Sequence, residues 1–445
     1  MMIEEFKAFI QGEELCKLSD KILLSVSGGP DSVCLVHLFH QSGYEIGLAH
    51  CNYQLRGDDA DGDESFVKEL AHALDTPFFS ISFPTRKRAE EEKKSIQEVA
   101  RDLRYDWLEG LRQEEGYTWI ATGHQFDDSV ETVLFNLAKG CGIRGLHGIL
   151  PKQGKLIRPL LFTGKSRIID FLDAEGISYR RDLSNQELYY DRNKIRHGVI
   201  PVLKSINPNF SATSRRTLQN LREVEKFYKA GIERWIVRVV QVYAGGLRIS
   251  WEELNKSPAP PTLLYEIMAA YGFGRDQVQS VLARTELQPG KQWSSPTHRL
   301  LSDRDALLLE AIPDQEIEPI QIGPEDLEVS TPDGTLFMEQ LSAPPAQFRD
   351  SSWEAILDAR KIQFPLRLRR WKPGDYFHPL GMNGKRKKLQ DFFSDKKLSL
   401  FEKEKVWVLE SSGQIAWLVG HRIDESFKLR PDSTACWRFR FEKNK

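Results

Sequence analysis

The sequence predicts an α/β protein: a doubly wound parallel sheet in an N-terminal domain, followed by a helical domain and a small α+β C-terminal domain. Two observations predict the first domain. Short apolar segments alternate with amphipathic segments over roughly the first 200 residues, and such alternation is typical of a parallel sheet with helices on both faces. The apolar segments are also almost continuously hydrophobic, as expected of strands buried on both faces.

Four strands and four helices are expected in this domain. The strands are short and rich in Ile, Leu, Val and Phe, and they cover Lys21–Val26, Tyr44–Cys51, Pro77–Phe83 and Tyr117–Gly123. The helices combine apolar residues at helical spacing with acidic residues near their starts. They cover Asp31–Gln41, Asp61–Leu74, Ser95–Glu114 and Phe126–Lys139. These elements predict a nucleotide-binding domain over residues 1–210.

The pattern changes after residue 210. A long helix is expected over Ser211–Val242, and shorter helical patterns follow at Leu263–Tyr271 and Arg275–Thr285. Residues 211–312 are therefore expected to form a helical domain. Residues 313–445 begin with a linker rich in Pro, Gly and acidic residues and continue as a small α+β domain. The long helix is expected to present one apolar face, formed by Leu218, Leu221, Val224, Phe227, Ile232, Ile236 and Val239.

Composition excludes several classes of protein. A net charge of -2 argues against a nucleic-acid binder that is basic over its whole surface. The 5 cysteines include no Cys-x-x-Cys pair, so neither a zinc ribbon nor a redox dithiol is expected, and no disulfide framework is indicated. We expect no signal peptide and no membrane-spanning segment, because the first residues lack a long apolar run and we find no apolar stretch long enough to span a bilayer. We therefore expect a soluble cytoplasmic protein without a membrane partner.

The strongest chemical signal is the segment Ser25–Ser32, which reads SVSGGPDS between the first strand and the first helix. Two glycines allow a sharp turn, and the helix start contributes its dipole and free amides, so the segment suits pyrophosphate. The side chain of Asp31 can hold Mg²⁺ against the phosphates. A glycine-rich turn capped by Ser and Asp is the alternative. The predicted nucleotide-binding residues here are Ser27, Gly28, Gly29, Pro30, Asp31 and Ser32.

This segment is not a Walker A loop, because it lacks the Gly-Lys-Ser/Thr ending. It resembles instead the PP-loop, Ser-Gly-Gly-x-Asp-Ser, of the ATP pyrophosphatase superfamily. The resemblance implies an enzyme that cleaves ATP between its α- and β-phosphates. Such enzymes attach AMP to an oxygen and so turn that oxygen into a leaving group. ATP and Mg²⁺ are the cofactors that the resemblance implies.

Polar residues also follow the second predicted strand. His50 and Asn52 lie at its end, and Arg56 comes shortly after. In a doubly wound sheet the carboxyl ends of strands beside the first strand face the nucleotide. We therefore expect these three side chains to contact the adenosine or the phosphates, although a histidine at a strand end is more often structural.

A second polar group follows the fourth predicted strand, where Gly123 and His124 precede Asp127, Asp128 and Glu131 at a helix start. Carboxylates at this position can simply complement the helix dipole. Beside a phosphate site they can also bind Mg²⁺ or accept a proton from an amine. We expect Gly123 and His124 to contact the nucleotide, and Asp128 to hold Mg²⁺ together with Asp31.

Further motifs in the same order narrow the resemblance to the tRNA(Ile)-lysidine synthetase family, over essentially the whole chain. One departure is Tyr53, which stands where the family usually has a second histidine. The motifs are Gly140–Leu146, Ile157–Leu160, Arg180, Asp182, Ser184-Asn185, Arg192–Arg196, Ile200-Pro201, Leu368–Asp375, Leu380-Gly381 and Lys387–Phe393.

The resemblance implies an ATP-dependent ligase that forms a carbon–nitrogen bond in two steps. The C2 oxygen of the wobble cytidine of a CAU-anticodon tRNA(Ile) attacks the α-phosphate, and the amine of free L-lysine then displaces AMP. The product reads AUA instead of AUG. Asp127 or Asp128 is expected to deprotonate or position the amine, while Arg192 and Arg196 neutralise phosphates or clamp the lysine carboxylate. With Asp31, these residues are the predicted catalytic set, and a homodimer is reasonable.

Basic residues gather late in the chain and predict a tRNA-binding surface over residues 211–445, although a solvated charged face is the alternative. The cations are Arg367, Arg369, Arg370, Lys372, Lys385, Arg386, Lys387, Lys388, Lys396 and Lys397. Interleaved aromatic residues are expected to stack on bases: Trp371, Tyr376, Phe377, Phe392 and Phe393.

Three other functions remain open. A PP-loop tRNA thiolase, or another tRNA-adenylating enzyme, is the nearest; thiolases need catalytic cysteines, and only Cys141 in the glycine-rich loop keeps that option. A glutamine-dependent amide ligase would need a glutaminase domain with an N-terminal cysteine, whereas this sequence begins Met1-Met2. A non-catalytic RNA-binding protein is the third, and the intact phosphate loop argues against it.

Overall fold

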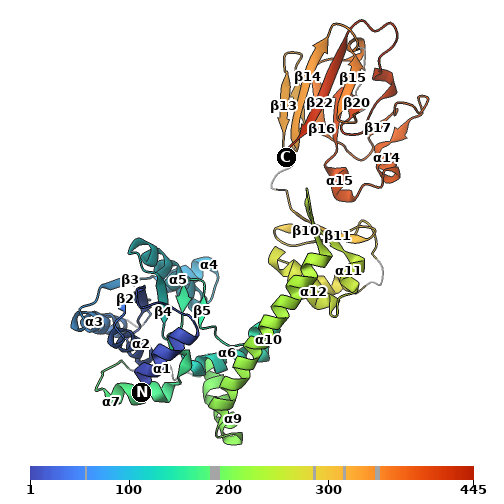
Figure 1. Ribbon diagram of the computed structural model, residues 1–445. Helices are drawn as coiled ribbons and strands as arrows, with labels where there is room; N and C mark the ends of the chain where they lie inside the picture. Colours follow the sequence, from blue (N-terminus) through green and yellow to red (C-terminus); the bar gives the residue numbers. More distant parts are fainter. Residues whose placement is uncertain (56–57, 181–190, 284–286, 314–316, 346–350, 445) are drawn as a thin grey trace. The chain divides into compact units, whose positions relative to one another are not determined.

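The computed structural model describes residues 1–445 except 56–57, 181–190, 284–286, 314–316, 346–350 and 445. The chain divides into two compact units, residues 1–229 and 230–445. Figure 1 shows the elements of each unit along the chain.

The first unit is built on a six-stranded sheet with the strand order β3-β2-β1-β4-β6-β5. All four predicted strands are confirmed, because β1 to β4 pair in parallel as neighbours. A short parallel strand, β6, and an antiparallel edge strand, β5, extend the sheet. The strands are β1 (Lys21–Ser25), β2 (Glu45–Asn52), β3 (Phe78–Ser82), β4 (Trp119–Thr122), β5 (Lys152–Gln153) and β6 (Leu156–Ile157).

Helices cover both faces of this sheet, which confirms the doubly wound fold. In β1, Ile22 and Leu24 pack into a core shared with α1, α2, α3 and α7, whereas Leu23 packs on the opposite face against α5. Successive strand residues point to opposite faces, so an all-apolar strand serves two cores. The helices are α1 (Met2–Gly12), α2 (Pro30–Gln41), α3 (Asp58–Ala73), α4 (Thr85–Glu92), α5 (Ile96–Glu114), α6 (Phe126–Lys139) and α7 (Lys165–Ala174).

A long helix, α10 (Phe210–Val239), spans the boundary between the two units. It follows α8 (Asp191–Lys194), a π-helical turn (Ile195–Val199) and α9 (Ile200–Ile206). The expected continuous apolar face is wrong in its middle. Leu218 packs in a core with α6 and Val239 packs in a core of the second unit, but Phe227 is 82% exposed. The ends of α10 are buried in different cores, so its central side chains need not be buried.

The second unit contains the two short helices that were expected, α12 and α13. It also contains a helix, α11, and a five-stranded antiparallel sheet, β7-β8-β11-β10-β9, that were not predicted. The helices are α11 (Trp251–Asn255), α12 (Pro260–Met268) and α13 (Arg275–Leu282). They share one core with the sheet. The strands are β7 (Val240–Tyr243), β8 (Gly246–Ser250), β9 (Gln292–Ser294), β10 (His298–Ser302) and β11 (Ala306–Ala311).

The C-terminal part contains two antiparallel sheets that pack on one shared core, β12-β16-β19-β20-β21 and β13-β14-β22-β15. Helix α14 (Leu389–Asp395) covers the other face of the first sheet, α15 (Leu400–Glu404) follows, and β17 (Tyr376–Phe377) pairs with β18 (Lys387–Lys388). The remaining strands are β12 (Ile320–Ile322), β13 (Glu328–Thr331), β14 (Gly334–Leu341), β15 (Glu354–Asp358), β16 (Leu366–Arg370), β19 (Trp407–Ser411), β20 (Gln414–Leu418), β21 (Arg422–Ile423) and β22 (Cys436–Lys443).

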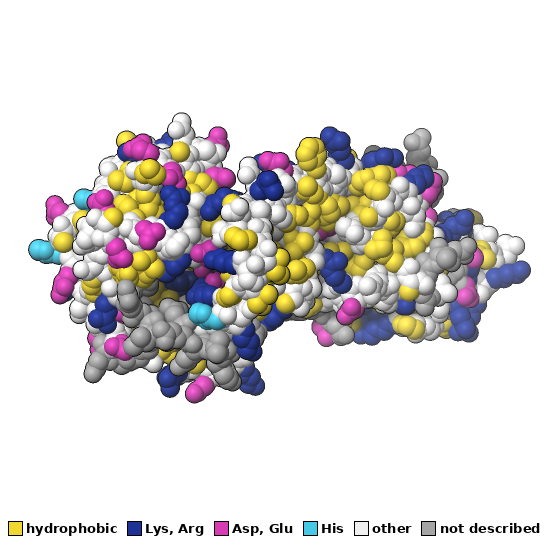
Figure 2. Space-filling model, turned by 90° about the horizontal axis from the view of Figure 1, so that it is seen from below, with side chains coloured by type: hydrophobic (Ala, Val, Ile, Leu, Met, Phe, Trp, Pro, Cys, Tyr) yellow, Lys and Arg dark blue, Asp and Glu magenta, His cyan; other side chains and the backbone are white. Residues whose placement is uncertain are grey.

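Across the residues that the structure describes, no helix is long and apolar enough to cross a membrane. On the face shown in Figure 2, basic and acidic side chains are intermingled. This distribution agrees with a chain that has 62 basic and 64 acidic residues. Any surface that attracts polyanions must therefore be local.

Candidate active site

The PP-loop turns sharply between β1 and α2. Gly28 has a φ of +84°, a left-handed conformation that strongly favours glycine. The Ser32 hydroxyl accepts a hydrogen bond from the Ser27 N–H at 3.2 Å and donates one to the Gly29 carbonyl at 2.9 Å. Gly29 caps α2 and Pro30 begins it. The loop is thus folded on itself at a helix start, the backbone arrangement that suits an anion.

A cavity of about 220 Å³ lies over this loop. Its wall is formed by the ends of β1, β2 and β4, by the starts of α2 and α6, and by one residue of α5. The lining residues are Ser25, Val26, Ser27, Asp31, Ser32, Cys51, Tyr53, Arg104, Thr122, Gly123, His124 and Asp128. The structure therefore brings together, around one cavity, predicted residues from the PP-loop and from the start of α6.

Gly123 allows the segment after β4 to approach the PP-loop closely. A Cβ atom at this position would lie 3.1 Å from the backbone of both Asp31 and Ser32. The adjacent His124 lines the cavity, and its Nδ1 lies 2.8 Å from the Thr122 hydroxyl. The glycine thus keeps the two loops together, and His124 faces the space between them.

Asp31 projects from the first turn of α2 and meets a lysine from another part of the chain. The Lys165 ammonium lies 2.8 Å from Asp31 Oδ2. Among the described residues, Asp31 Oδ1 is buried without a hydrogen-bond partner. Burial raises the pKa of Asp31, and the nearby Lys165 opposes that rise. One carboxylate oxygen is therefore neutralised while the other has no partner.

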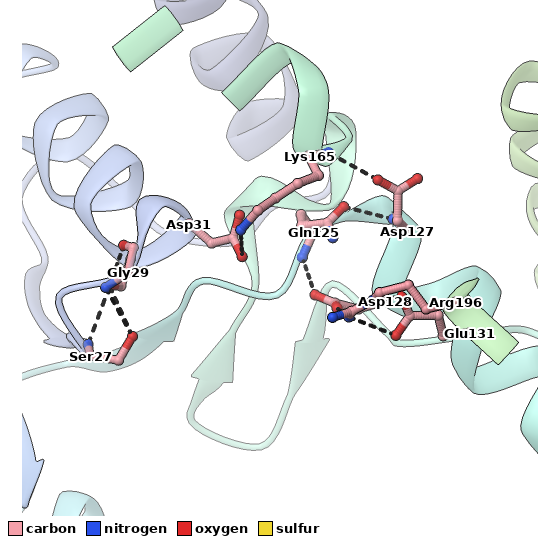
Figure 3. Close-up of polar contacts among 10 residues, drawn as sticks. Ser27, Gly29, Asp31, Gln125, Asp127, Asp128, Glu131, Lys165 and Arg196 are labelled. Carbon is pink, nitrogen blue, oxygen red and sulfur yellow. Dashed lines mark hydrogen bonds and ion pairs between the residues drawn. The ribbon is translucent and has the colours of Figure 1, made fainter. Parts of the chain in front are cut away.

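The two carboxylates at the start of α6 point to different neighbours (Figure 3). Asp127 Oδ2 accepts the backbone N–H of Lys165 at 2.9 Å, at the start of α7, and Asp127 is not among the cavity-lining residues. Asp128 lines the cavity, and its Oδ2 accepts the Gln125 N–H at 3.0 Å. The Gln125 side chain in turn accepts the Asp127 N–H at 2.7 Å.

An acidic pair holds Arg196 beside the cavity. Arg196 donates two hydrogen bonds to Glu131, at 2.6 Å and 2.9 Å, and lies 3.6 Å from Asp128. Glu131 is almost fully buried. Burial raises the pKa of Asp128 to about 6, and the negative charges of Glu131 and Asp31 add to this rise. Asp128 is thus a carboxylate whose pKa lies close to neutral pH, as acid–base groups require.

Two other predicted residues lie slightly apart from this cavity. His50 is buried on β2, and its Nδ1 is 2.9 Å from the Val26 carbonyl. Asn52 donates to Asp61 at 3.0 Å and to Glu64 at 3.3 Å, both on α3. Both line a smaller cavity of about 130 Å³ that shares Ser27, Cys51 and Tyr53 with the larger one. Their contact with a nucleotide stays a prediction.

Two predicted residues cannot be compared with the structure. Arg56 lies outside the described residues, and Arg192 lies on α8 with a side chain that the structure does not describe. Tyr53, the departure from the family pattern, lines the cavity and stacks on Phe83 with 6.2 Å between ring centroids. Burial raises its pKa, and its hydroxyl is hydrogen-bonded with Cys51. Tyr53 thus forms an aromatic part of the cavity wall.

Sequence reasoning missed two cations: Arg104, which lines the cavity, and Lys165, which lies outside the lining but pairs with the cavity-lining Asp31. Its sequence position could have indicated Arg104. It lies four residues before Leu108 and seven before Leu111, so helical spacing places it on the buried face of α5. A cation on the apolar face of a helix is unusual and indicates a partner or a cavity. Lys165 offered no such signal, because only the folded chain brings it to Asp31.

The residues present fit a bound Mg²⁺. Asp31 Oδ1 has no partner, and Asp128 faces the same cavity. Carboxylate oxygens are the ligands that Mg²⁺ prefers, and it usually takes only one or two from protein and completes its shell with water and phosphate. No group of three or more candidate ligand residues occurs in the described part of the chain.

The predicted tRNA-binding surface is only partly exposed. Arg369 is buried, because it bridges Asp375 and Glu410, with contacts of 2.7 Å to each. The expectation that all five aromatic residues stack on bases is wrong. Phe377, Phe392 and Phe393 pack in the core under the sheet, whereas Tyr376 is 44% exposed with the Arg386 guanidinium 3.5 Å above its ring. Alternation along β17 exposes Tyr376 and buries Phe377, whereas the adjacent Phe392 and Phe393 of α14 are both buried.

Comparisons with known proteins identify relatives of the whole chain. Residues 2–203 match the family model of the PP-loop domain, residues 243–312 the TilS substrate binding domain, and residues 366–441 the TilS substrate C-terminal domain. The tRNA(Ile)-lysidine synthase of Parabacteroides distasonis is 39% identical over 96% of this chain and 97% of its own length. The enzyme of the same name from Bacteroides thetaiotaomicron is 38% identical over 95% of each chain.

Proposed function

Because the chain belongs to the tRNA(Ile)-lysidine synthase family, we propose that it joins free L-lysine to C2 of the wobble cytidine in a CAU-anticodon tRNA(Ile). The reaction consumes ATP and releases AMP and pyrophosphate. The observation that carries the proposal is that the PP-loop and Asp128 line the same cavity. We place the reaction in the cytoplasm.

In the first step, the PP-loop binds the phosphates of ATP through Ser27, Ser32 and the backbone at the start of α2. The C2 oxygen of cytidine attacks the α-phosphorus, and the bond to the β-phosphate oxygen breaks, so that its electron pair leaves with pyrophosphate. Asp31 and Asp128 would hold Mg²⁺, which when bound would supply positive charge against the phosphates. The adenylated oxygen is then a good leaving group.

In the second step, the lysine amine must be neutral to attack C2. Asp128 is the better candidate for accepting its proton, because Asp128 faces the cavity and Asp127 is bonded to the start of α7. Arg196, held by Glu131, is placed to balance negative charge from AMP or from the lysine carboxylate. AMP leaves when the carbon–nitrogen bond forms.

The test supplies purified protein with ATP, Mg²⁺, labelled lysine and a CAU-anticodon tRNA(Ile) transcript, with tRNA(Met) as the control. We expect label only in tRNA(Ile), with stoichiometric AMP and pyrophosphate. Pyrophosphate release without lysine incorporation would favour another nucleophile, first of all sulfur, since Cys141 is exposed. Absence of both products would contradict the proposal.

A further inference from the structure

We propose that Lys165 is a catalytic residue that exchanges partners during nucleotide binding. Its ammonium pairs with Asp31, and it turns to a phosphate oxygen of ATP once a divalent cation occupies Asp31. This inference rests on the proposed function, because it gives Lys165 a task in ATP binding and pyrophosphate release.

The first support is that the backbone of Lys165 is held in place while its side chain extends toward Asp31 (Figure 3). Lys165 begins α7, and its backbone N–H is held by Asp127 Oδ2 at 2.9 Å. Its side chain is 40% exposed and reaches across to Asp31, 134 residues away in the sequence. The backbone is therefore fixed, while the four-carbon side chain keeps the freedom to turn to a new partner.

The second support is the state of Asp31. Lys165 occupies Oδ2, while Oδ1 is buried and has no hydrogen-bond partner among the described residues. An ionised carboxylate can accept about four hydrogen bonds or metal contacts. A buried carboxylate oxygen without a partner, on a phosphate-binding loop, is suited to a further cation. Lys165 therefore occupies one of the two carboxylate oxygens of Asp31 and leaves the other available to a cation.

The third support is charge balance in the cavity. The segment Ser25–Ser32 contains no lysine or arginine, so cations for the triphosphate must come from other elements. A divalent cation at Asp31 repels the Lys165 ammonium at such short range, and a bound phosphate then offers the ammonium a new anion. When the bond between the α- and β-phosphates breaks, negative charge grows on the departing oxygen. An ammonium beside it stabilises that charge.

The experiment compares Lys165→Gln and Lys165→Arg with the wild-type protein. The matched control is Arg167→Gln, which removes a positive charge two residues further along α7. Arg167 pairs with Glu5 at 2.8 Å, and the two side chains are 47% and 40% exposed. Binding of Mn²⁺ alone is followed by the electron paramagnetic resonance of free Mn²⁺, and binding of ATP with Mg²⁺ by calorimetry. Thermal unfolding of each variant is recorded without ligand.

We expect Lys165→Gln to bind Mn²⁺ alone at least about 3-fold more tightly, because the competing ammonium is gone. It should bind ATP with Mg²⁺ about 10-fold or more weakly, the usual effect of losing one hydrogen bond between charged groups. Pyrophosphate release in the presence of tRNA should fall further. Lys165→Arg should bind Mn²⁺ like the wild type and ATP with intermediate affinity, and Arg167→Gln should match the wild type throughout.

A purely structural ion pair predicts a different pattern. Weaker Mn²⁺ binding by Lys165→Gln, or an unchanged affinity for ATP with Mg²⁺, would overturn the inference. If Lys165→Gln does not fold, the ATP affinity of Lys165→Arg tests the inference instead. An affinity equal to that of the wild type would overturn the inference. Both binding measurements need neither tRNA nor lysine. A wild-type protein that transfers no lysine would therefore contradict the proposed function without affecting this test.

Discussion

At the scale of single residues, two neighbouring carboxylates have different surroundings. Asp127 and Asp128 are adjacent at the start of α6, and the sequence alone gave them one shared role. Consecutive helical residues point about 100° apart, so Asp127 reaches the start of α7 and Asp128 reaches the cavity. The fold therefore separates a residue that positions Lys165 from a residue that can act on the substrate.

The first prediction concerns Asp128→Asn. Folding raises the pKa of Asp128 to about 6, above an unfolded value of about 4. The folded protein thus holds this proton more tightly, so ionisation of Asp128 costs stability; the cost is absent below about pH 4 and complete above about pH 6. Asp128→Asn should raise the free energy of unfolding at pH 7.5 by about 1–3 kcal/mol. It should also abolish lysine transfer.

Denaturant titrations at pH 4.5 and pH 7.5 measure this effect, and the stabilisation should shrink at the lower pH. Asp127→Asn is the comparison. It weakens the charge at the start of α7 and should lower stability by about 0.5–1 kcal/mol at both pH values. If Asp128→Asn destabilised the protein at pH 7.5, the claim that burial makes the ionisation of Asp128 unfavourable would be wrong.

At the scale of elements, α10 is held at its two ends by different cores. Leu218 packs against Phe126 and Val130 of α6, while Ile236 and Val239 pack against the sheet and helices of the second unit. Leu218→Ala should therefore lower the free energy of unfolding of the first unit by about 2–4 kcal/mol. Phe227→Ser, on the exposed part of the same helix, should change it by less than about 0.5 kcal/mol.

Chemical denaturation followed by circular dichroism distinguishes the two variants. Equal losses of stability for Leu218→Ala and Phe227→Ser would mean that the middle of α10 is also buried in solution. That result would restore the continuous apolar face expected from the sequence.

Elements with a strong hydrophobic period were predictable, and those without one were not. The strands and helices around the PP-loop were predicted to within a few residues. Helix α4 was missed because TRKRAEEE has no apolar period, and β11 was missed because ALLLEA suits a helix as well as a strand.

In the candidate site, the PP-loop and the start of α6 could be predicted to meet, since the parallel strands before them end at the same edge of the sheet. Lys165 approaches from α7 and depends on tertiary packing.

At the scale of the whole molecule, a chain with a net charge of -2 must bind a polyanion through local patches. Lys385 and Lys388 are exposed, and Lys388 pairs with Tyr376 across β17 and β18, whereas Arg369 is buried between two carboxylates. The double variant Lys385→Gln, Lys388→Gln should therefore weaken tRNA binding. It should also reduce the slope of log affinity against log salt by about 1.5–2, because two phosphate contacts are lost.

Arg369→Gln is the contrasting variant for that measurement. It leaves Asp375 and Glu410 without their buried partner and should destabilise the domain by about 3–5 kcal/mol, while the salt slope of the folded fraction stays unchanged. Filter binding of tRNA(Ile) over a range of salt concentrations gives both slopes. An unchanged slope for the double lysine variant would indicate a solvated face that does not contact tRNA.

The position of β22 has a consequence for the synthesis of the protein. Residues Cys436–Lys443 form a central strand, which pairs with β14 on one side and β15 on the other. Domains generally fold in order as the ribosome extends the chain, but this sheet stays incomplete until its latest strand emerges. Until then, β14 and β15 each present an unpaired edge, which is prone to aggregation. Translation that stops short of β22 would therefore leave an active-site domain attached to an unfinished sheet, a substrate for chaperones and proteases.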